Sequence, residues 1–116
     1  LMIMEQVIQN YNQLFWSLIK DYNLGEPNLL RKVIHSFDVA RNCFAVACNR
    51  QFSERERNLC YLIGLFHDIG RFEQWRLYQT YDDNKSVDHG ELSYQILNDG
   101  KDETFFNLNQ NEFYLM

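Results

Sequence analysis

Residues 59–71 read LCYLIGLFHDIGR, an apolar run that ends in a histidine, an aspartate and then a glycine. Apolar residues at this spacing predict a buried helix. We expect Gly70 to end that helix, which places His67 and Asp68 in its last turn. The C-terminus of a helix carries partial negative charge, so a cation beside this pair is favoured. Gly64 has no side chain and would let another helix come close.

The rest of the chain also has the pattern of long helices. It contains only one proline and five glycines, so it has few turn-forming residues. Apolar residues at helical spacing predict helices over four further segments, which are residues 3–22, 28–50, 87–98 and, in part, 105–115. Ser53 and Glu56 form a capping box before the helix of the 59–71 stretch, and Ser86 is the expected N-cap of the helix at 87–98. Residues 71–85 are interpreted as a loop or a short helix. No segment has strand periodicity, and we predict an all-α helical bundle.

Size, charge and cysteine content narrow the function. A chain of 116 residues is expected to form a single domain. Its net charge of −5 argues against a nucleic-acid partner, although a bound metal would let it accept a small phosphorylated substrate. Three cysteines without CxxC spacing predict buried thiols in a reducing compartment, and they are Cys43, Cys48 and Cys60. No apolar stretch has the length of a membrane span, so we expect no membrane partner and a cytoplasmic protein.

The chain has three histidines, His35, His67 and His89, and each lies where a metal ligand would be useful. First-row transition ions accept imidazole nitrogen and carboxylate oxygen together. His35, His67 and Asp68 would leave coordination positions open, as a catalytic site requires. A structural role is the alternative for each histidine. His35 would then be a structural histidine, His67 a donor to a helix-end carbonyl, and His89 a plain helix-start residue.

The sequence resembles the HD superfamily of metal-dependent phosphohydrolases over about residues 28–98. The resemblance rests on three motifs, which are KVIHSFDVAR at 32–41, FHDIGR at 66–71 and TYDDNKSVDHG at 80–90. It implies an all-helical fold. It also implies hydrolysis of a phosphate ester, whose substrate is a nucleotide or another small phosphorylated molecule.

The resemblance also implies roles for single residues. His35, His67 and Asp68 match the family's metal ligands, and His89 matches a histidine that binds a second metal or the substrate phosphate in some members. The cofactor is then a divalent ion, with Mn, Fe, Co, Ni, Zn and Mg all open. Asp68 would act in catalysis as well, and Arg71 occupies a position where a basic residue would meet phosphate.

The family's distal aspartate ligand has no clear counterpart in this chain. Asp99 and Asp102 qualify by residue type alone, because they flank Gly100 in a predicted turn. We therefore interpret residues 1–116 as the N-terminal part of an HD domain, truncated on its C-terminal side. The alternative to a hydrolase is a non-catalytic HD module that binds a nucleotide or a protein partner, or that assembles as a homo-oligomer.

The segment between the second and third motifs holds residues with two interpretations each. Three carboxylates would either orient the histidines or form a solvated acidic loop, and they are Asp82, Asp83 and Asp88. Three aromatic residues would either stack on a nucleobase or, as we favour, pack within the protein, and they are Trp75, Tyr78 and Tyr81. Arg71 would either meet phosphate or complement the dipole of the preceding helix.

Overall fold

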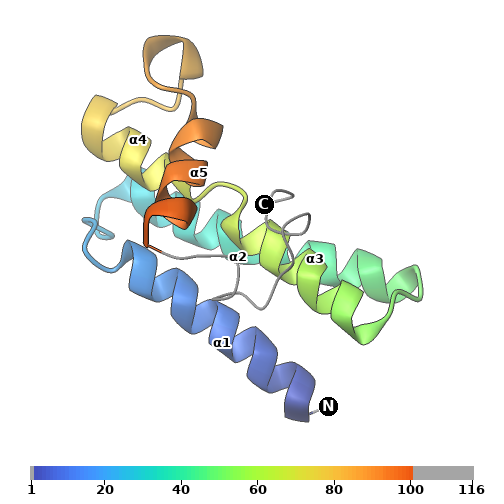
Figure 1. The fold of residues 1–116 in the computed structure, drawn as a ribbon. Helices are drawn as coiled ribbons and strands as arrows, with labels where there is room; N and C mark the ends of the chain where they lie inside the picture. Colours follow the sequence, from blue (N-terminus) through green and yellow to red (C-terminus); the bar gives the residue numbers. More distant parts are fainter. Residues whose placement is uncertain (1, 101–116) are drawn as a thin grey trace. The chain divides into compact units, whose positions relative to one another are not determined.

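The computed structural model describes residues 2–100, with side chains from residue 6 to residue 98. Within that range the chain is helical and contains no strand, which confirms the predicted all-α class. The elements in chain order are α1 (Met2–Ile19), α2 (Pro27–Asn49), α3 (Glu54–Phe66), α4 (Gly70–Tyr78), the short 3-10 helix η1 (Asp83–Lys85) and α5 (His89–Gly100) (Figure 1). The predicted segment at 105–115, the Asp102 candidate and the Asp99 side chain lie outside the described part.

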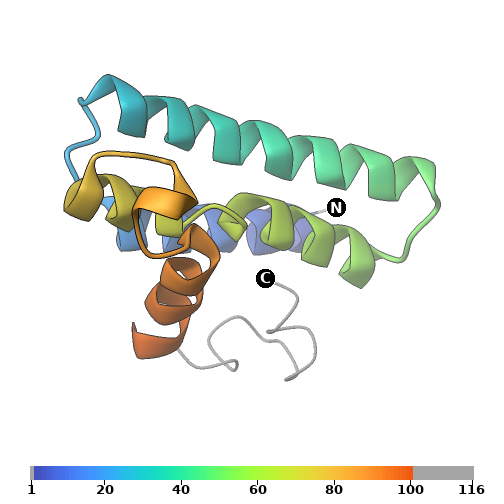
Figure 2. The same ribbon diagram turned by 90° about the horizontal axis from the view of Figure 1, so that it is seen from above.

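The chain divides into two compact units, one ending at Phe66 and one beginning at His67. In the first unit α3 packs against both α1 and α2. Figure 2 shows α2 and α3 running side by side in opposite directions. The core of this unit is aromatic. The Phe15 ring is fully buried and makes edge contacts with Phe37 and Phe66, at centroid distances of 5.4 and 5.6 Å. Edge-to-face pairs of this kind add to the stabilisation that burial provides.

Gly64 allows the close approach of α2 and α3, as the sequence predicted. A Cβ at this position would lie 3.0 Å from the Cα of Ala40 and 3.1 Å from Sγ of Cys43. Both contacts are tighter than ordinary van der Waals packing. A larger residue at position 64 would therefore push the two helices apart.

Side-chain caps start the second and third helices. Glu26 accepts hydrogen bonds from the backbone N–H groups of Asn28 and Leu29, at 2.8 and 3.2 Å. Pro27 follows in the first turn, where its missing N–H costs nothing. The predicted capping box of α3 is confirmed, because the Ser53 N–H donates to Glu56 Oε1 at 2.9 Å and the Glu56 N–H donates to Ser53 Oγ at 3.2 Å.

Replacing Ser53 by alanine is expected to lower the free energy of unfolding by about 1 kcal/mol, because one N–H group of the first turn loses its acceptor. Chemical denaturation followed by circular dichroism measures the change. Ser53→Asp keeps an acceptor at the same place and should stay within a few tenths of a kcal/mol of the parent, roughly. An aspartate variant as unstable as the alanine variant would show that the cap is not the cause.

The second unit contains α4, η1 and α5, and α4 packs against α5. Two predicted boundaries here are wrong. Gly70 begins α4 instead of ending α3, so His67 and Asp68 lie in the turn between these helices. Ser86 does not cap α5. Its hydroxyl donates to the Val87 carbonyl, and Asp88 accepts from the Gly90 N–H in the first turn of α5.

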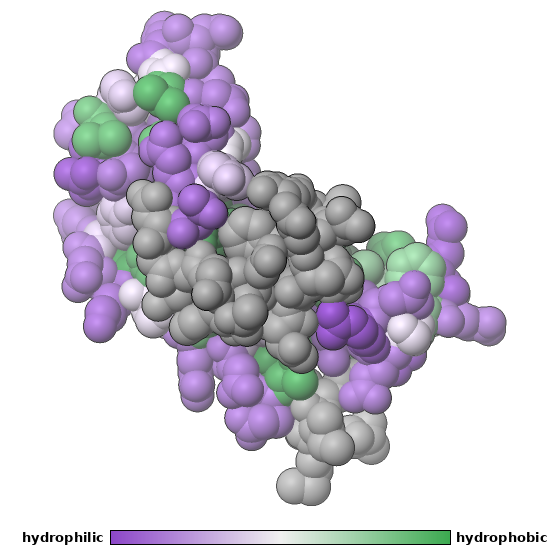
Figure 3. Space-filling view, in the orientation of Figure 1, coloured by the Kyte–Doolittle hydropathy of each residue, from purple (hydrophilic) through white to green (hydrophobic). Residues whose placement is uncertain are grey.

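Three further expectations concern the cysteines, membrane-spanning helices and the number of domains. No cysteine is buried, since Cys43 and Cys60 are partly exposed and Cys48 is exposed, so the prediction of buried thiols was wrong. Within residues 2–100, no helix has both the length and the apolar character needed to cross a bilayer. Hydrophilic residues predominate over the described surface of α4 and the η1 loop in Figure 3. The single-domain organisation stays a prediction.

Candidate metal centre

The second unit brings four of the predicted site residues together. His67 and Asp68 lie in the turn before α4, Arg71 lies in the first turn of α4, and His89 is the first residue of α5. The α4–α5 packing sets their spacing. Gly70 is central to it, because a Cβ there would lie 2.2 Å from the carbonyl oxygen of His89. The missing side chain therefore lets the start of α5 come directly against the start of α4.

The Asp68 carboxylate is the centre of this group. The residue is 7% exposed, and its two oxygens face different histidines. Oδ2 lies 3.4 Å from Nε2 of His67, and Oδ1 lies 3.4 Å from Nε2 of His89. Oδ1 is also 3.9 Å from Nε of Arg71. Two imidazole nitrogens thus point at one carboxylate in a largely buried position.

His89 has a second carboxylate on its other side. Its Nδ1 lies 2.8 Å from Oδ2 of Asp83, and its backbone N–H donates to Oδ1 of the same residue at 3.1 Å. The hydrogen bond with the His89 side chain is the main cause that holds the pKa of Asp83 well below its usual range. Asp83 is therefore a carboxylate under ordinary conditions and acts as an acceptor.

Arg71 and Gln74 hold the loop that carries Asp83. NH1 of Arg71 donates to the Gln74 side chain, to the Tyr81 carbonyl and to Asp83, and the guanidinium carbon lies 5.8 Å from the centre of the Tyr81 ring. Gln74 is fully buried and donates to Asp83 and Ser86, at 2.9 and 2.7 Å. These bonds tie the loop to α4 on the side of the histidines.

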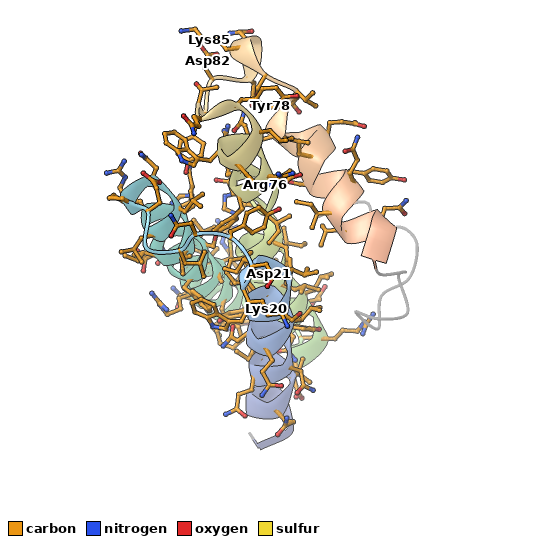
Figure 4. The ribbon with its side chains drawn as sticks, turned by 90° about the vertical axis from the view of Figure 1, so that its left-hand side faces the viewer. Lys20, Asp21, Arg76, Tyr78, Asp82 and Lys85 are labelled. Atoms are coloured by element: carbon orange, nitrogen blue, oxygen red, sulfur yellow. The ribbon has the colours of Figure 1, made fainter. Side chains whose placement is uncertain are left out.

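The loop has a solvent side as well. Asp82 and Lys85 are exposed, and Figure 4 shows both at the tip of the loop, beyond the end of α4 that carries Tyr78. Asp82 caps η1 by accepting from the Asn84 N–H at 2.9 Å. Of the three loop carboxylates, Asp83 is thus the one whose bonds reach across to α4 and His89.

The aromatic residues of this segment pack partly against each other. The rings of Trp75 and Tyr81 lie 5.1 Å apart and are tilted by 43°. Tyr78 remains 42% exposed. The packing interpretation therefore fits Trp75 and Tyr81 and does not fit Tyr78.

His35 lies in the first unit, near the middle of α2, with its side chain exposed. The same helix carries the buried residues Val33, Ser36 and Ala40 on its inner face. His35 is therefore off the apolar stripe, as its polar neighbours predicted.

The donor atoms of the second unit fit a metal ion. Imidazole nitrogen with carboxylate oxygen is the mixed set that first-row transition ions accept, and His67, Asp68 and His89 supply it. Asp83, Asp88 and His89 also form a group, and their donor atoms lie within 4.8 Å of one another. The Asp83 oxygens already accept from Gln74, Arg71 and His89, so this second group is a weaker candidate.

Comparison with known families agrees with the resemblance found in the sequence. The family model for the HD domain matches residues 33–111, and this chain therefore belongs to the HD domain family. The matched range includes all three histidines and the His67–Asp68 pair. A search of curated proteins and a search of solved structures each found no significant match.

The sequence did not predict the role of Gln74 or the position of Arg71 at the start of a helix. Gln74 carried no signal, because its place one turn after Arg71 matters only once residues 70–78 are known to be helical. Arg71 was given the alternative of complementing the dipole of the preceding helix. That alternative stays a prediction, and the structure places Arg71 in the first turn of α4.

Proposed function

We propose that this protein is a metal-dependent phosphohydrolase whose substrate is a nucleotide or another small phosphate ester. His35, His67 and Asp68 would hold one divalent ion, and His89 would bind a second ion or the substrate phosphate. The observation that carries the proposal is the Asp68 carboxylate, whose two oxygens each lie 3.4 Å from a histidine Nε2. Membership of the HD domain family supports the same ligand set.

The chemistry follows from this arrangement. A bound divalent ion lowers the pKa of a coordinated water and polarises a phosphoryl oxygen. One oxygen of Asp68 faces each histidine, so each oxygen would be able to bind an ion together with the histidine that it faces. Its low exposure, 7%, limits competing water and strengthens its charge interactions.

Arg71 is proposed as the residue that neutralises phosphate charge. Its Nε is buried, makes no hydrogen bond within the described part of the chain, and lies on the side of Asp68. Its NH1 is held by Gln74, Tyr81 and Asp83, so the guanidinium is already oriented. An oriented cation loses little side-chain entropy when it meets a phosphate.

Metal content and His35 test the proposal together. The purified chain should contain a transition metal by elemental analysis, bind Mn²⁺ by calorimetry and release phosphate from a panel of nucleotides only when metal is present. His35→Ala should weaken Mn²⁺ binding by about 10-fold or more, because it removes a side chain that would bind the ion directly. Asp38→Ala is the matched control, since Asp38 is an exposed residue on the same helix whose carboxylate pairs with Arg41. Equal loss in both variants would contradict a ligand role for His35.

The second candidate function is a non-catalytic HD module that binds a nucleotide or a protein partner, including a second copy. The observation in its favour is an exposed apolar pair on α2, since Leu30 and Ile34 lie one turn apart and are 46% and 53% exposed. A folded protein that binds no metal, together with self-association measured by light scattering, would favour this function over hydrolysis.

A further inference from the structure

Asp83 is hydrogen-bonded to three other residues of the second unit, which are Arg71, Gln74 and His89. Its Oδ1 accepts from three donors. These are the backbone N–H of His89 at 3.1 Å, Nε2 of Gln74 at 2.9 Å and NH1 of Arg71 at 3.3 Å. Its Oδ2 lies 2.8 Å from Nδ1 of the His89 ring. Oδ1 therefore accepts from α4 side chains and from a backbone N–H, whereas Oδ2 faces the His89 ring.

This arrangement decides which nitrogen of the neutral His89 ring carries the proton. A carboxylate only accepts hydrogen bonds, and each ring nitrogen of His89 faces one. Nδ1 lies 2.8 Å from Oδ2 of Asp83, whereas Nε2 lies 3.4 Å from Oδ1 of Asp68, so the single N–H makes the shorter hydrogen bond at Nδ1. Neutral imidazole has one N–H, and the lone pair then belongs to Nε2. That nitrogen faces Oδ1 of Asp68 at 3.4 Å. With its lone pair free, Nε2 of His89 can bind an ion together with Oδ1 of Asp68. An Nε2 that carries a hydrogen has no lone pair in the ring plane and cannot bind an ion.

We propose that Asp83 is a positioning residue that selects the Nδ1–H tautomer of His89 and so directs the Nε2 lone pair toward a metal ion shared with Asp68. The proposal rests on the metal centre described under the proposed function. Carboxylates that accept the second N–H of a ligand histidine fix both its tautomer and its ring orientation in other metal sites. Asp83 would act through His89 and would not touch the ion itself.

The scaffold contacts explain why Asp83 can do this from an irregular loop. Gln74 is fully buried, and Arg71 is 16% exposed at its side chain. NH1 of Arg71 donates to the side-chain oxygen Oε1 of Gln74. The Nε2 amino group of Gln74 is then the end of the amide that donates to Asp83 and Ser86. The Asp83 carboxylate is thus held by donors from α4 while its other oxygen meets His89.

Asp83→Asn gives a sharp test because the scaffold dictates how the amide turns. Three N–H donors surround the position of Oδ1, so the amide oxygen has to occupy it. The amide NH₂ then takes the position of Oδ2, 2.8 Å from Nδ1 of His89. An NH₂ group needs an acceptor there, so the ring proton should move to Nε2 and the lone pair to Nδ1.

The measurement is the ¹⁵N spectrum of the histidine side chains in the metal-free full chain, at alkaline pH where neutral imidazole dominates. Three histidines give three ring systems, and His89→Gln identifies the one of interest. The parent should show His89 as Nδ1–H and Asp83→Asn should show it as Nε2–H. Asp82→Asn is the matched control, because Asp82 is exposed and its capping bond to the Asn84 N–H can be made by an amide oxygen. It should leave the tautomer unchanged.

Calorimetry with Mn²⁺ alone supplies the second readout. Asp83→Asn should weaken Mn²⁺ binding by about 10- to 100-fold, and Asp82→Asn should not. Weaker binding with an unchanged tautomer would overturn the proposal, since Asp83 would then support the loop only. A parent spectrum with His89 as Nε2–H would overturn it without any variant, including the case in which Asp83→Asn fails to fold. A parent that binds no Mn²⁺ but shows the tautomer switch would refute the metal centre and leave tautomer selection by Asp83 supported.

Discussion

Replacing Gly70 by alanine is expected to lower the free energy of unfolding by about 3 kcal/mol or more, the upper range for overpacking a buried position. An added Cβ would lie 2.2 Å from the His89 carbonyl oxygen, 2.5 Å from the Ser93 backbone nitrogen and 2.6 Å from Ser93 Oγ. Two of these atoms are backbone, so α4 and α5 would have to separate. The separation would also break the hydrogen bond that the Gly70 N–H donates to Ser93 Oγ at 2.8 Å.

Urea denaturation followed by circular dichroism measures this loss. Gly90→Ala is the matched control, because the added Cβ would meet only the flexible end of Asp88, at 2.9 Å from Oδ2. Gly90 lies in the first turn of α5, where alanine has up to about 1 kcal/mol more helix propensity than glycine. This gain opposes the weakening of the cap, in which Asp88 accepts from the Gly90 N–H. Its stability should therefore stay close to the parent. Equal stability of both alanine variants would show that the close approach at Gly70 is not needed.

Asp68→Asn is expected to weaken Mn²⁺ binding by more than about 100-fold, a larger loss than removal of an outer partner causes. The amide keeps the shape of the side chain but removes the charge and one of the two acceptor oxygens that face His67 and His89. The metal-free variant should remain folded, since the amide fills the same space and Arg71 keeps its ion pair with Asp83. Hydrolysis of nucleotides should fall to the level measured without metal.

Thermal unfolding with and without Mn²⁺ gives an independent readout of this change. A ligand present at 100 times its Kd stabilises the folded state by about 2.7 kcal/mol, and Asp68→Asn should lose that gain. Asp82→Asn removes one carboxylate from the same unit, away from the histidines, and should keep it. Full metal-dependent stabilisation in Asp68→Asn would contradict the proposed centre.

Local sequence signals placed most of the helices correctly. The α3 cap follows from Ser53 and Glu56 alone, and the break before α2 follows from Pro27, because both depend on neighbouring backbone groups. The boundary at Gly70 was misplaced for a physical reason. Glycine often ends a helix through a left-handed backbone, but no described glycine has a positive φ angle, and Gly70 is needed here for space.

By itself, the sequence determined the helical class, the HD domain family and the candidate ligands His35, His67, Asp68 and His89. The helical class follows from periodicity and capping patterns. The family and the ligand set follow from the resemblance of short motifs to the HD superfamily, and all of these signals are properties of nearby residues. The tertiary structure alone decided that Asp83, Gln74 and Arg71 form one hydrogen-bonded support beneath His89. Their contacts span an irregular loop, and a loop has no repeating pattern from which side-chain direction can be predicted. The packing of α4 against α5 brings the two ends of that loop together, and this packing depends on the space left at Gly70.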